Sequence, residues 1–207
     1  MNITAGEALA RLREGNLRFV QNAPTEHSIT SREARADLLG GQEPFAVVLG
    51  CSDSRAPVEV VFDQGFGDLF VIRVAGNIVA PSQVGSIEFA AERFRTPLVV
   101  VLGHTRCGAI DATLDELQRP VLNQSPNLRA IVDRIRPAVE GLLESELRGG
   151  REALARAAMR ANVRASVNHL RHGSALLENA IARSGLRVVG AEYSLETGMV
   201  EFYDGVE

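Results

Sequence analysis

Three short, continuously apolar runs most restrict the fold of this 207-residue chain. They cover residues 45–49, 69–74 and 98–102 and are rich in branched side chains. Runs that are apolar at consecutive positions are typical of strands buried on both faces of a parallel sheet. Segments with a helical pattern separate and follow the runs, at residues 57–62, 82–94 and 107–117. The sequence therefore predicts an α/β fold, with a mostly parallel central β-sheet flanked by helices.

The amino-terminal part carries two helix-start signals. Thr4 with Glu7, and Thr30 with Glu33, have the spacing of capping boxes, and leucines at helical spacing follow the first pair. These signals predict a helical arm over residues 1–40, which precedes the first strand and packs outside the main sheet.

The carboxy-terminal half is mainly helical, with breaks expected at Pro137 and Gly173. The tail predicts two strands, at residues 186–193 and 199–203, joined by a turn around Gly198.

Length and composition fit a single domain over residues 1–207, in which the arm over 1–40 precedes an α/β core over 45–207. Hydrophobic residues make up 45% of the chain, which is ample for a buried core. All 22 basic residues are arginine, so Schiff-base chemistry, a lysine general base and the lysine-containing phosphate loop are excluded. A net charge of −4, spread without blocks, argues against nucleic-acid or anionic-membrane partners.

The sequence also indicates a compartment. Its first residues lack the apolar run of a signal peptide, and no stretch is apolar over the length of a membrane helix. We therefore expect a cytoplasmic protein, in which thiols stay reduced and a cysteine pair is more often metal-binding or catalytic than bridged.

Metal-donor residues follow two of the predicted strands. Both Cys51 and His104 come directly after the letters VVLG. The carboxyl ends of parallel strands meet at one edge of a sheet, and neighbouring strands lie about 4.8 Å apart. Cys107 follows His104 by three residues at an expected helix start, an offset that predicts both side chains on one helical face. A shared metal is the interpretation we favour.

Two thiolates and one imidazole form a recognised ligand set of catalytic zinc, with the fourth position open for water. The chain has no third cysteine that could close the site. Asp53 follows the first ligand by two residues, where a carboxylate can accept a hydrogen bond from zinc-bound hydroxide. Arg55 can hold that carboxylate ionised and oriented.

Each of these residues also has a simpler interpretation. A single cysteine is more often a small core residue than a ligand. Asp53 and Arg55 would then form an ordinary ion pair in a loop. The joint position of two cysteines and a histidine at strand ends favours the metal site. We expect the other histidines, His27, His169 and His172, to lie on the solvated surface.

The sequence resembles the β-class carbonic anhydrases, in their plant-like branch. That family carries a CxDSR motif followed farther along by HxxCG, and the corresponding residues here are 51–55 and 104–108. Supporting stretches match at residues 14–20, 67–79, 85–90 and 99–110. The resemblance therefore covers nearly the whole chain.

The resemblance implies a zinc lyase that reversibly hydrates carbon dioxide to bicarbonate and a proton, by attack of zinc-bound hydroxide. The Zn2+ would be held by Cys51, His104 and Cys107. Asp53 would orient the hydroxide, and Arg55 would pair with Asp53.

A substrate pocket is implied as well. Gln42, Phe70, Ala75 and Phe89 fall at its lining positions, and Gly108 ends the second motif. The family often has valine in place of Ala75 and tyrosine in place of Phe89, so a slightly roomier or less polar pocket is expected. Apolar walls suit carbon dioxide, and the amide of Gln42 can hydrogen-bond an oxygen.

Members of the family form dimers by exchanging their amino-terminal helices, often paired into tetramers, and the pocket is completed at the dimer interface. The resemblance therefore implies a homodimer or homotetramer, with the amino-terminal helices packing on a partner subunit. Gln42 and Phe70 would belong to the contributions of different subunits.

The family also has a closed form, in which the aspartate binds zinc and bicarbonate occupies a regulatory site built around a tryptophan, an arginine and a tyrosine. Arg73 matches the arginine, but Val48 stands at the tryptophan position and the chain has no tryptophan. We therefore expect an open site, with Asp53 paired to Arg55.

Two alternatives remain open at this point. The same site could hydrolyse carbon disulfide or carbonyl sulfide, or the chain could be a non-catalytic zinc-binding paralogue. The paralogue would be expected to have lost Asp53 or Arg55, and both are present. A cysteine phosphatase is excluded because Arg55 stands four residues after Cys51, whereas a Cys-x5-Arg loop places the arginine six residues after the cysteine. No residue is assigned as the proton shuttle.

Overall fold

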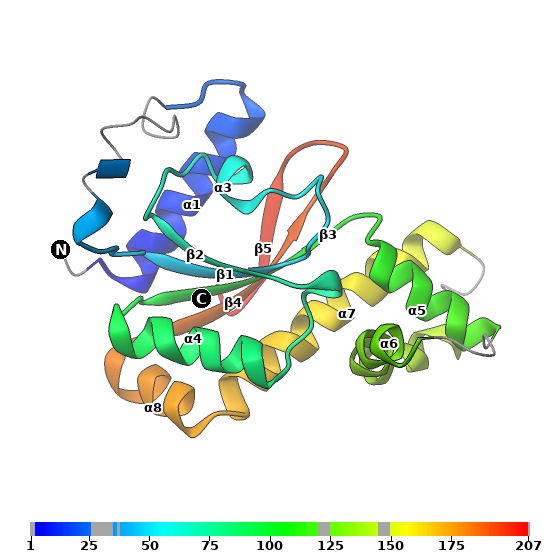
Figure 1. Cartoon of the computed structure of the whole chain (residues 1–207). Coiled ribbons are helices and arrows are strands. Elements are labelled where there is room, and N and C mark those ends of the chain that lie inside the picture. The colour runs from blue at the N-terminus through cyan, green and yellow to red at the C-terminus, as the bar shows by residue number, and fades with distance from the viewer. Residues whose placement is uncertain (1–2, 26–34, 37, 120–124, 145–149, 207) are drawn as a thin grey trace.

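The computed structural model describes residues 3–25, 35–36, 38–119, 125–144 and 150–206. Its centre is a five-stranded sheet in the order β2-β1-β3-β4-β5 (Figure 1). The first four strands in this order are parallel to their neighbours, and β5 runs antiparallel to β4. The strands are β1 Ala46–Gly50, β2 Leu69–Arg73, β3 Leu98–His104, β4 Arg187–Tyr193 and β5 Val200–Asp204. The predicted α/β class with a mostly parallel sheet is confirmed.

Helices cover both faces of the sheet. The α-helices are α1 Ala5–Val20, α3 Val58–Val61, α4 Pro81–Arg93, α5 Gly108–Gln118, α6 Pro126–Val139, α7 Arg151–His172 and α8 Ala175–Ser184. Short 3-10 helices are η2 Leu38–Gly40, η3 Ala75–Asn77 and η4 Glu140–Glu144. Figure 1 shows α1 and α3 on one face, α4, α7 and α8 on the other, and α5 and α6 beside one end of the sheet. None of the helices in the described ranges has the length and hydropathy needed to span a bilayer.

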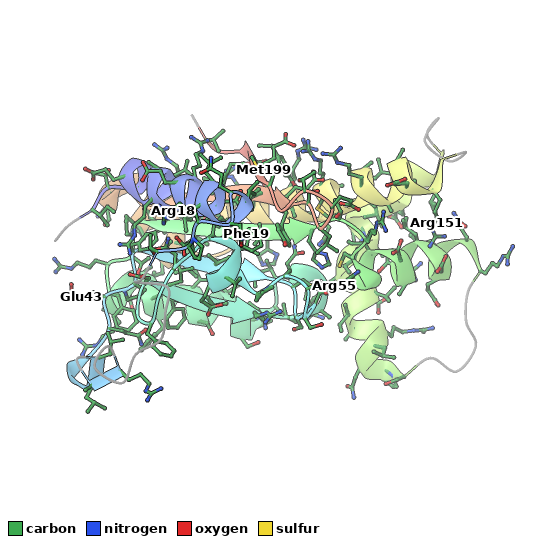
Figure 2. The ribbon with its side chains drawn as sticks, turned by 90° about the horizontal axis from the view of Figure 1, so that it is seen from above. Arg18, Phe19, Glu43, Arg55, Arg151 and Met199 are labelled. Carbon is green, nitrogen blue, oxygen red and sulfur yellow. The ribbon has the colours of Figure 1, made fainter. Side chains whose placement is uncertain are left out.

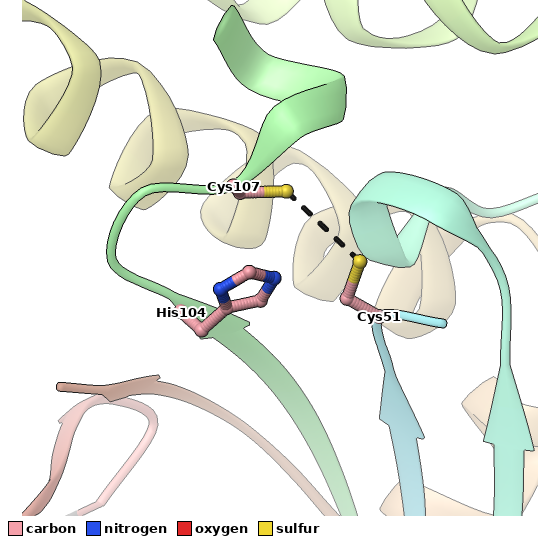
Figure 3. Close-up of side chains that lie close together, drawn as sticks. All are labelled: Cys51, His104 and Cys107. Atoms are coloured by element: carbon pink, nitrogen blue, oxygen red, sulfur yellow. Dashed lines mark hydrogen bonds between the residues drawn. The ribbon is translucent and has the colours of Figure 1, made fainter. Parts of the chain in front are cut away.

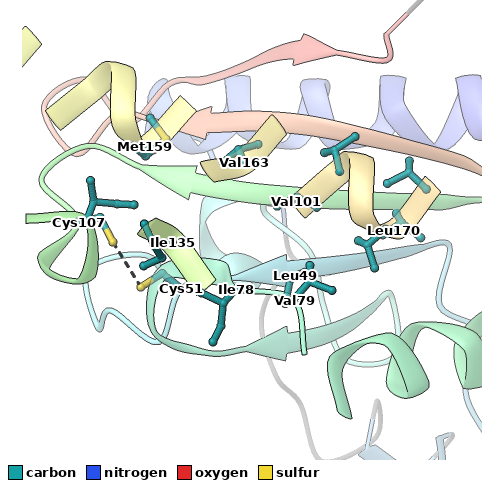
Figure 4. Close-up of a cluster of buried hydrophobic side chains, with 14 of the residues drawn as sticks. Leu49, Cys51, Ile78, Val79, Val101, Cys107, Ile135, Met159, Val163 and Leu170 are labelled. Atoms are coloured by element: carbon teal, nitrogen blue, oxygen red, sulfur yellow. Dashed lines mark hydrogen bonds between the residues drawn. The ribbon is translucent and has the colours of Figure 1, made fainter. Parts of the chain in front are cut away.

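Continuous apolar runs become strands because each strand faces two cores. In β1, Val47 and Leu49 belong to the cluster under α4, α7 and α8, whereas Ala46 and Val48 belong to the cluster under α1 and α3. Every residue of β1 and β3 is buried. The first cluster extends to Cys51 and Cys107, which lie at one end of it in Figure 4.

Most of the helix starts and helix ends predicted from the sequence are found in the structure. The capping box at Thr4 is formed, with Thr4 Oγ1 accepting from the Glu7 N–H at 3.2 Å and Glu7 Oε2 accepting from the Thr4 N–H at 2.8 Å. Gly173 lies between α7 and α8 as predicted. The break expected at Pro137 is misplaced, because Pro137 lies inside the last turn of α6, which ends two residues later and continues as η4. The second capping box, Thr30 with Glu33, lies outside the described residues, as does His27.

The amino-terminal helix is seated on the chain's own sheet. Ala8, Leu9 and Leu12 of α1 join the buried cluster on that face. The side chain of Asn16 donates to the Val61 and Gly198 carbonyls at 3.1 and 2.8 Å. Gly15 brings α1 close to the end of α3, where a Cβ would lie 2.9 Å from the Phe62 carbonyl carbon.

This close approach predicts opposite effects of two glycine-to-alanine substitutions in α1. Gly15→Ala is expected to lower the free energy of unfolding by about 2 kcal/mol, because the methyl group would overlap the Phe62 backbone. Gly6→Ala is the matched control, since its Cβ would meet no atom closer than 4.0 Å, and it is expected to raise stability by up to about 1 kcal/mol. Urea denaturation measures both. Equal stability of the two variants would contradict the seating of α1.

Candidate metal centre

Cys51 and His104 meet because β1 and β3 are parallel neighbours. The register pairs Gly50 with Leu102, so Cys51, just after β1, lies beside the last residues of β3. His104 is the final residue of β3 and is only 1% exposed. The Gly76 N–H points at Cys51 Sγ from 3.4 Å and supports a thiolate there. The expected meeting of the two strand ends is confirmed.

Cys107 reaches the same point by a tight turn. His104 is in an extended strand, Arg106 has a left-handed φ of 55°, and Cys107 is the residue that caps the start of α5. The expectation that His104 and Cys107 share a helical face is therefore wrong, because the chain reverses direction between them instead of winding. The turn nevertheless brings the Cys107 and Cys51 sulfurs to 4.0 Å (Figure 3).

The three side chains fit a zinc ion. Their ligand atoms all lie within 4.8 Å of one another, and all three residues are buried. Tetrahedral zinc with Zn–S bonds of about 2.3 Å places two sulfurs roughly 3.8 Å apart, close to the distance found. His104 Nδ1 lies 2.9 Å from the Thr105 carbonyl, so it carries the proton and Nε2 presents its lone pair. That buried Nε2 has no hydrogen-bond partner among the described residues, as expected of a metal ligand.

The pKa values of the three ligand side chains are shifted by their mutual contacts, in a way that favours binding of a cation. The hydrogen bond with Cys107 lowers the pKa of Cys51, and the same interaction, together with burial, raises the pKa of Cys107. The two sulfurs thus hold one proton between them, and a cation displaces it. Burial lowers the pKa of His104, but the interactions with Cys51, Thr105 and Asp53 together outweigh it, so that the net pKa is raised. Protons and metal therefore compete for this site.

Asp53 and Arg55 are paired beside the ligands. Arg55 donates from Nε to Asp53 Oδ1 at 2.9 Å and from Nη2 to Oδ2 at 2.7 Å. These hydrogen bonds hold the pKa of Asp53 well below its usual range, although burial opposes them. Asp53 Oδ2 lies 3.8 Å from His104 Nε2, so an ionised, acceptor-only carboxylate stands next to the ligand atoms.

Arg73 is a site residue whose role the sequence did not reveal. It donates from Nε to the Cys51 carbonyl at 3.0 Å and from Nη2 to the Asp53 carbonyl at 2.6 Å. One guanidinium therefore fixes the loop that carries a ligand and the carboxylate. The pairing of strands explains this role, because Arg73 at the end of β2 is in register with Gly50, the residue before Cys51.

Val48, which stands at the tryptophan position of the family's regulatory site, is fully buried in the core under α1.

The expected pocket residues fall into two groups. Ala75 begins η3, next to the glycine that donates to Cys51, and Gly108 follows Cys107 at the start of α5. Phe70 and Phe89 lie elsewhere, with ring centroids 6.2 Å apart at the β2 edge of the sheet. Phe70 is in register with a residue four positions before Cys51, which corresponds to about 13 Å along the strand.

Gln42 is farther still from the metal ligands, because it precedes β1 whereas they follow the strands. It lines a cavity of about 510 Å³ together with Phe66 and Phe94. Figure 2 shows its neighbour Glu43 at one end of the molecule, far from Arg55. The structure therefore unites the three ligands, Asp53, Arg55, Ala75 and Gly108 within one chain.

The other histidines behave as expected where they are described, since His169 and His172 are exposed on α7. Cys51 and Cys107 are both free of disulfide bonds. The cluster of three is thus the group within the described ranges that could hold a metal ion.

Comparison with known proteins agrees with the geometry. Residues 46–200 match the model of the family described as carbonic anhydrase. Carbonic anhydrase 2 of Mycobacterium tuberculosis is 39% identical over 197 residues, which cover 94% of this chain and 91% of that protein. A carbonic anhydrase of Mycolicibacterium smegmatis is 39% identical over 192 residues, covering 92% and 89%.

Solved structures match over similar lengths. The β-carbonic anhydrase CafA of Aspergillus fumigatus has a TM-score of 0.75 and 28% identity, covering 97% of this chain and 90% of that one. A structure from work on two tetrameric β-carbonic anhydrases of Sordaria macrospora has a TM-score of 0.73 and 26% identity, covering 81% and 84%. With its Cys51, His104 and Cys107 cluster at the carboxyl edge of a matching sheet, this chain belongs to the β-carbonic anhydrase family.

Proposed function

We propose that the family's reaction, the reversible hydration of carbon dioxide to bicarbonate and a proton, takes place in this chain beside Cys51, His104 and Cys107. The enzymes of this family use zinc, and the observation that carries the proposal is the convergence of three buried ligand atoms within 4.8 Å. When bound there, zinc supplies Lewis acidity and makes hydroxide available near neutral pH.

Asp53 orients the nucleophile. It is ionised and can only accept hydrogen bonds, so it accepts one from the O–H of the attacking hydroxide. A lone pair of the hydroxide oxygen then stays directed at the substrate. Arg55 keeps the carboxylate in place through two hydrogen bonds from its guanidinium. Ala75 and Gly108 leave space and a weakly polar wall beside the ligands, which suits an uncharged substrate.

The remainder of the pocket comes from a second copy of the chain. Gln42, Phe70 and Phe89 lie too far from the metal ligands of their own chain to share a pocket with them. Gln42 and Phe70 are therefore assigned to the same subunit, and not to different subunits as the resemblance implied. Phe89 is 52% exposed beside β2, an edge strand whose outer side has no partner within the described chain. An exposed aromatic side chain beside an unpaired edge strand is typical of a surface that another subunit buries. A homodimer is thus the proposed unit, and the Sordaria proteins are described as tetrameric.

The helical arm contributes to the same assembly. The face of α1 that is not seated on the sheet leaves Leu17 and Val20 exposed, at 46% and 38%. These apolar residues are available to a partner subunit. Both cysteines must stay reduced to act as ligands, which supports the proposal of a cytoplasmic enzyme.

Removal of one ligand tests the metal and the activity together. His104→Ala is expected to lose zinc and carbon dioxide hydration, whereas His172→Ala, which removes an exposed histidine, keeps about one zinc per chain and full activity. Metal analysis and stopped-flow hydration measure the two properties. A zinc-loaded wild type without hydration activity in neutral and alkaline buffer would indicate the non-catalytic paralogue. Hydrolysis of carbonyl sulfide in its place would indicate the sulfur-substrate enzyme.

Replacement of Asp53 tests its orienting role. Asp53→Asn is expected to keep zinc and to lower kcat/KM by about 10- to 100-fold. Because the pKa of Asp53 is depressed, the carboxylate stays ionised above its usual titration range, and the loss should be the same at pH 6 and pH 8. Asp115→Asn, an exposed carboxylate on α5 paired with Arg151, is the control. Equal kcat/KM in Asp53→Asn and wild type would remove the proposed role.

Mixed dimers test the two-chain pocket. A chain with His104→Ala and a chain with Gln42→Ala are co-expressed with different tags, and the mixed dimer is purified. The ligands of one chain then meet Gln42 of the other in one complete site, so about half of the wild-type activity is expected. A pocket built within one chain leaves no complete site in this dimer. Activity equal to the mean of the two parent dimers would therefore contradict the proposal.

A further inference from the structure

The turn formed by Thr105 and Arg106 orients both halves of the metal centre. The Thr105 carbonyl accepts the Nδ1–H of His104 at 2.9 Å. The Arg106 carbonyl accepts from Arg55 Nη2 at 3.1 Å. Two consecutive carbonyls thus direct a ligand ring on one side and the guanidinium that holds Asp53 on the other. A small rotation of this turn would displace both.

The turn needs outside support, because Arg106 has a φ of 55°. This left-handed conformation is rare for residues other than glycine, asparagine and aspartate. Its neighbour Thr105 is fastened to the end of β4, where its N–H donates to the Tyr193 carbonyl at 3.0 Å. Thr105 Oγ1 also accepts the Leu195 N–H at 3.0 Å.

Glu196, in the connection between β4 and β5, receives both side chains of the turn. Its Oε2 accepts from Thr105 Oγ1 at 2.8 Å, and its Oε1 pairs with Arg106 Nε at 2.8 Å. Ser194 Oγ donates to the same Oε2 from 3.2 Å and fixes the carboxylate in turn. One carboxylate therefore joins two consecutive turn residues to a segment ninety positions farther along the chain.

Glu196 contributes more to the orientation of the turn than to the stability of the whole fold. Its side chain is 41% exposed and that of Arg106 is 66% exposed, so water weakens the ion pair between them. A bridge to two adjacent side chains still restricts the rotation of the turn. Loss of the bridge should therefore affect the orientation of His104 and Arg55 while the fold stays intact.

We propose that Glu196 is a positioning residue of the metal centre, which acts through the Thr105–Arg106 turn on His104 and Arg55. The inference rests on the proposed function insofar as this centre is the zinc site. It assigns Glu196 no contact with substrate.

The test compares Glu196→Ala and Glu196→Gln with Glu201→Ala. Glu201 is the matched control because it is a carboxylate on β5 that pairs with Arg156 and Arg160 and does not touch the turn. Zinc affinity of each purified protein is measured by chelator competition, stability by thermal unfolding, and hydration by stopped flow. The spectrum of the cobalt-substituted protein reports the ligand geometry.

Glu196→Ala is expected to weaken zinc binding and to lower kcat/KM, each by about tenfold, with a changed cobalt spectrum and an unfolding temperature like that of the control. Glu196→Gln should lie between Glu196→Ala and wild type, because its amide oxygen can still accept from Thr105. Zinc affinity and cobalt spectrum in Glu196→Ala equal to those of Glu201→Ala would overturn the proposal. Zinc affinity and the cobalt spectrum can be measured even if the wild type fails to hydrate carbon dioxide. Failure of the proposed function can therefore be distinguished from failure of this proposal.

Discussion

The centre depends on the parallel pairing of β1 with β3. Parallel strands in register end at the same edge, and this pairing brings the residue after β1 beside the last residue of β3. Cys51 and His104 thus become neighbours in space although they are far apart in the sequence. Because both faces of these strands are buried, a slip of one residue would turn an apolar core face toward the wrong helices. The core packing therefore also fixes the relative position of the ligands.

Arginine is the residue that joins the loops around this edge. Arg55 bridges the Asp53 carboxylate and the Arg106 carbonyl, and Arg73 bridges the carbonyls of Cys51 and Asp53. A planar guanidinium can hold two acceptors at fixed angles, whereas an ammonium group acts as a compact charge on a flexible stem. The absence of lysine from the chain is compatible with a site built in this way, since its cationic groups orient other residues.

The sequence predicted those features that depend on local pattern. Buried strands are visible as consecutive apolar residues, and the repeated strand endings placed Cys51 and His104 at one edge. The path to Cys107 was misjudged, because a three-residue offset fits a helix and a reversal equally well until the left-handed φ of Arg106 is known. The contacts of Glu196 had no signal in the sequence, since they join segments that are far apart in the chain.

The fold separates two requirements of the proposed enzyme. The metal ligands all come from one chain, so zinc binding needs only a folded subunit. Gln42 stands before β1, at the other end of a parallel strand, and no rearrangement of a loop can carry it along the length of the sheet. In a two-chain pocket, metal content therefore reports the folding of each subunit, whereas the hydration rate reports their association. Loss of activity with zinc retained would then indicate dissociation as readily as damage to the centre.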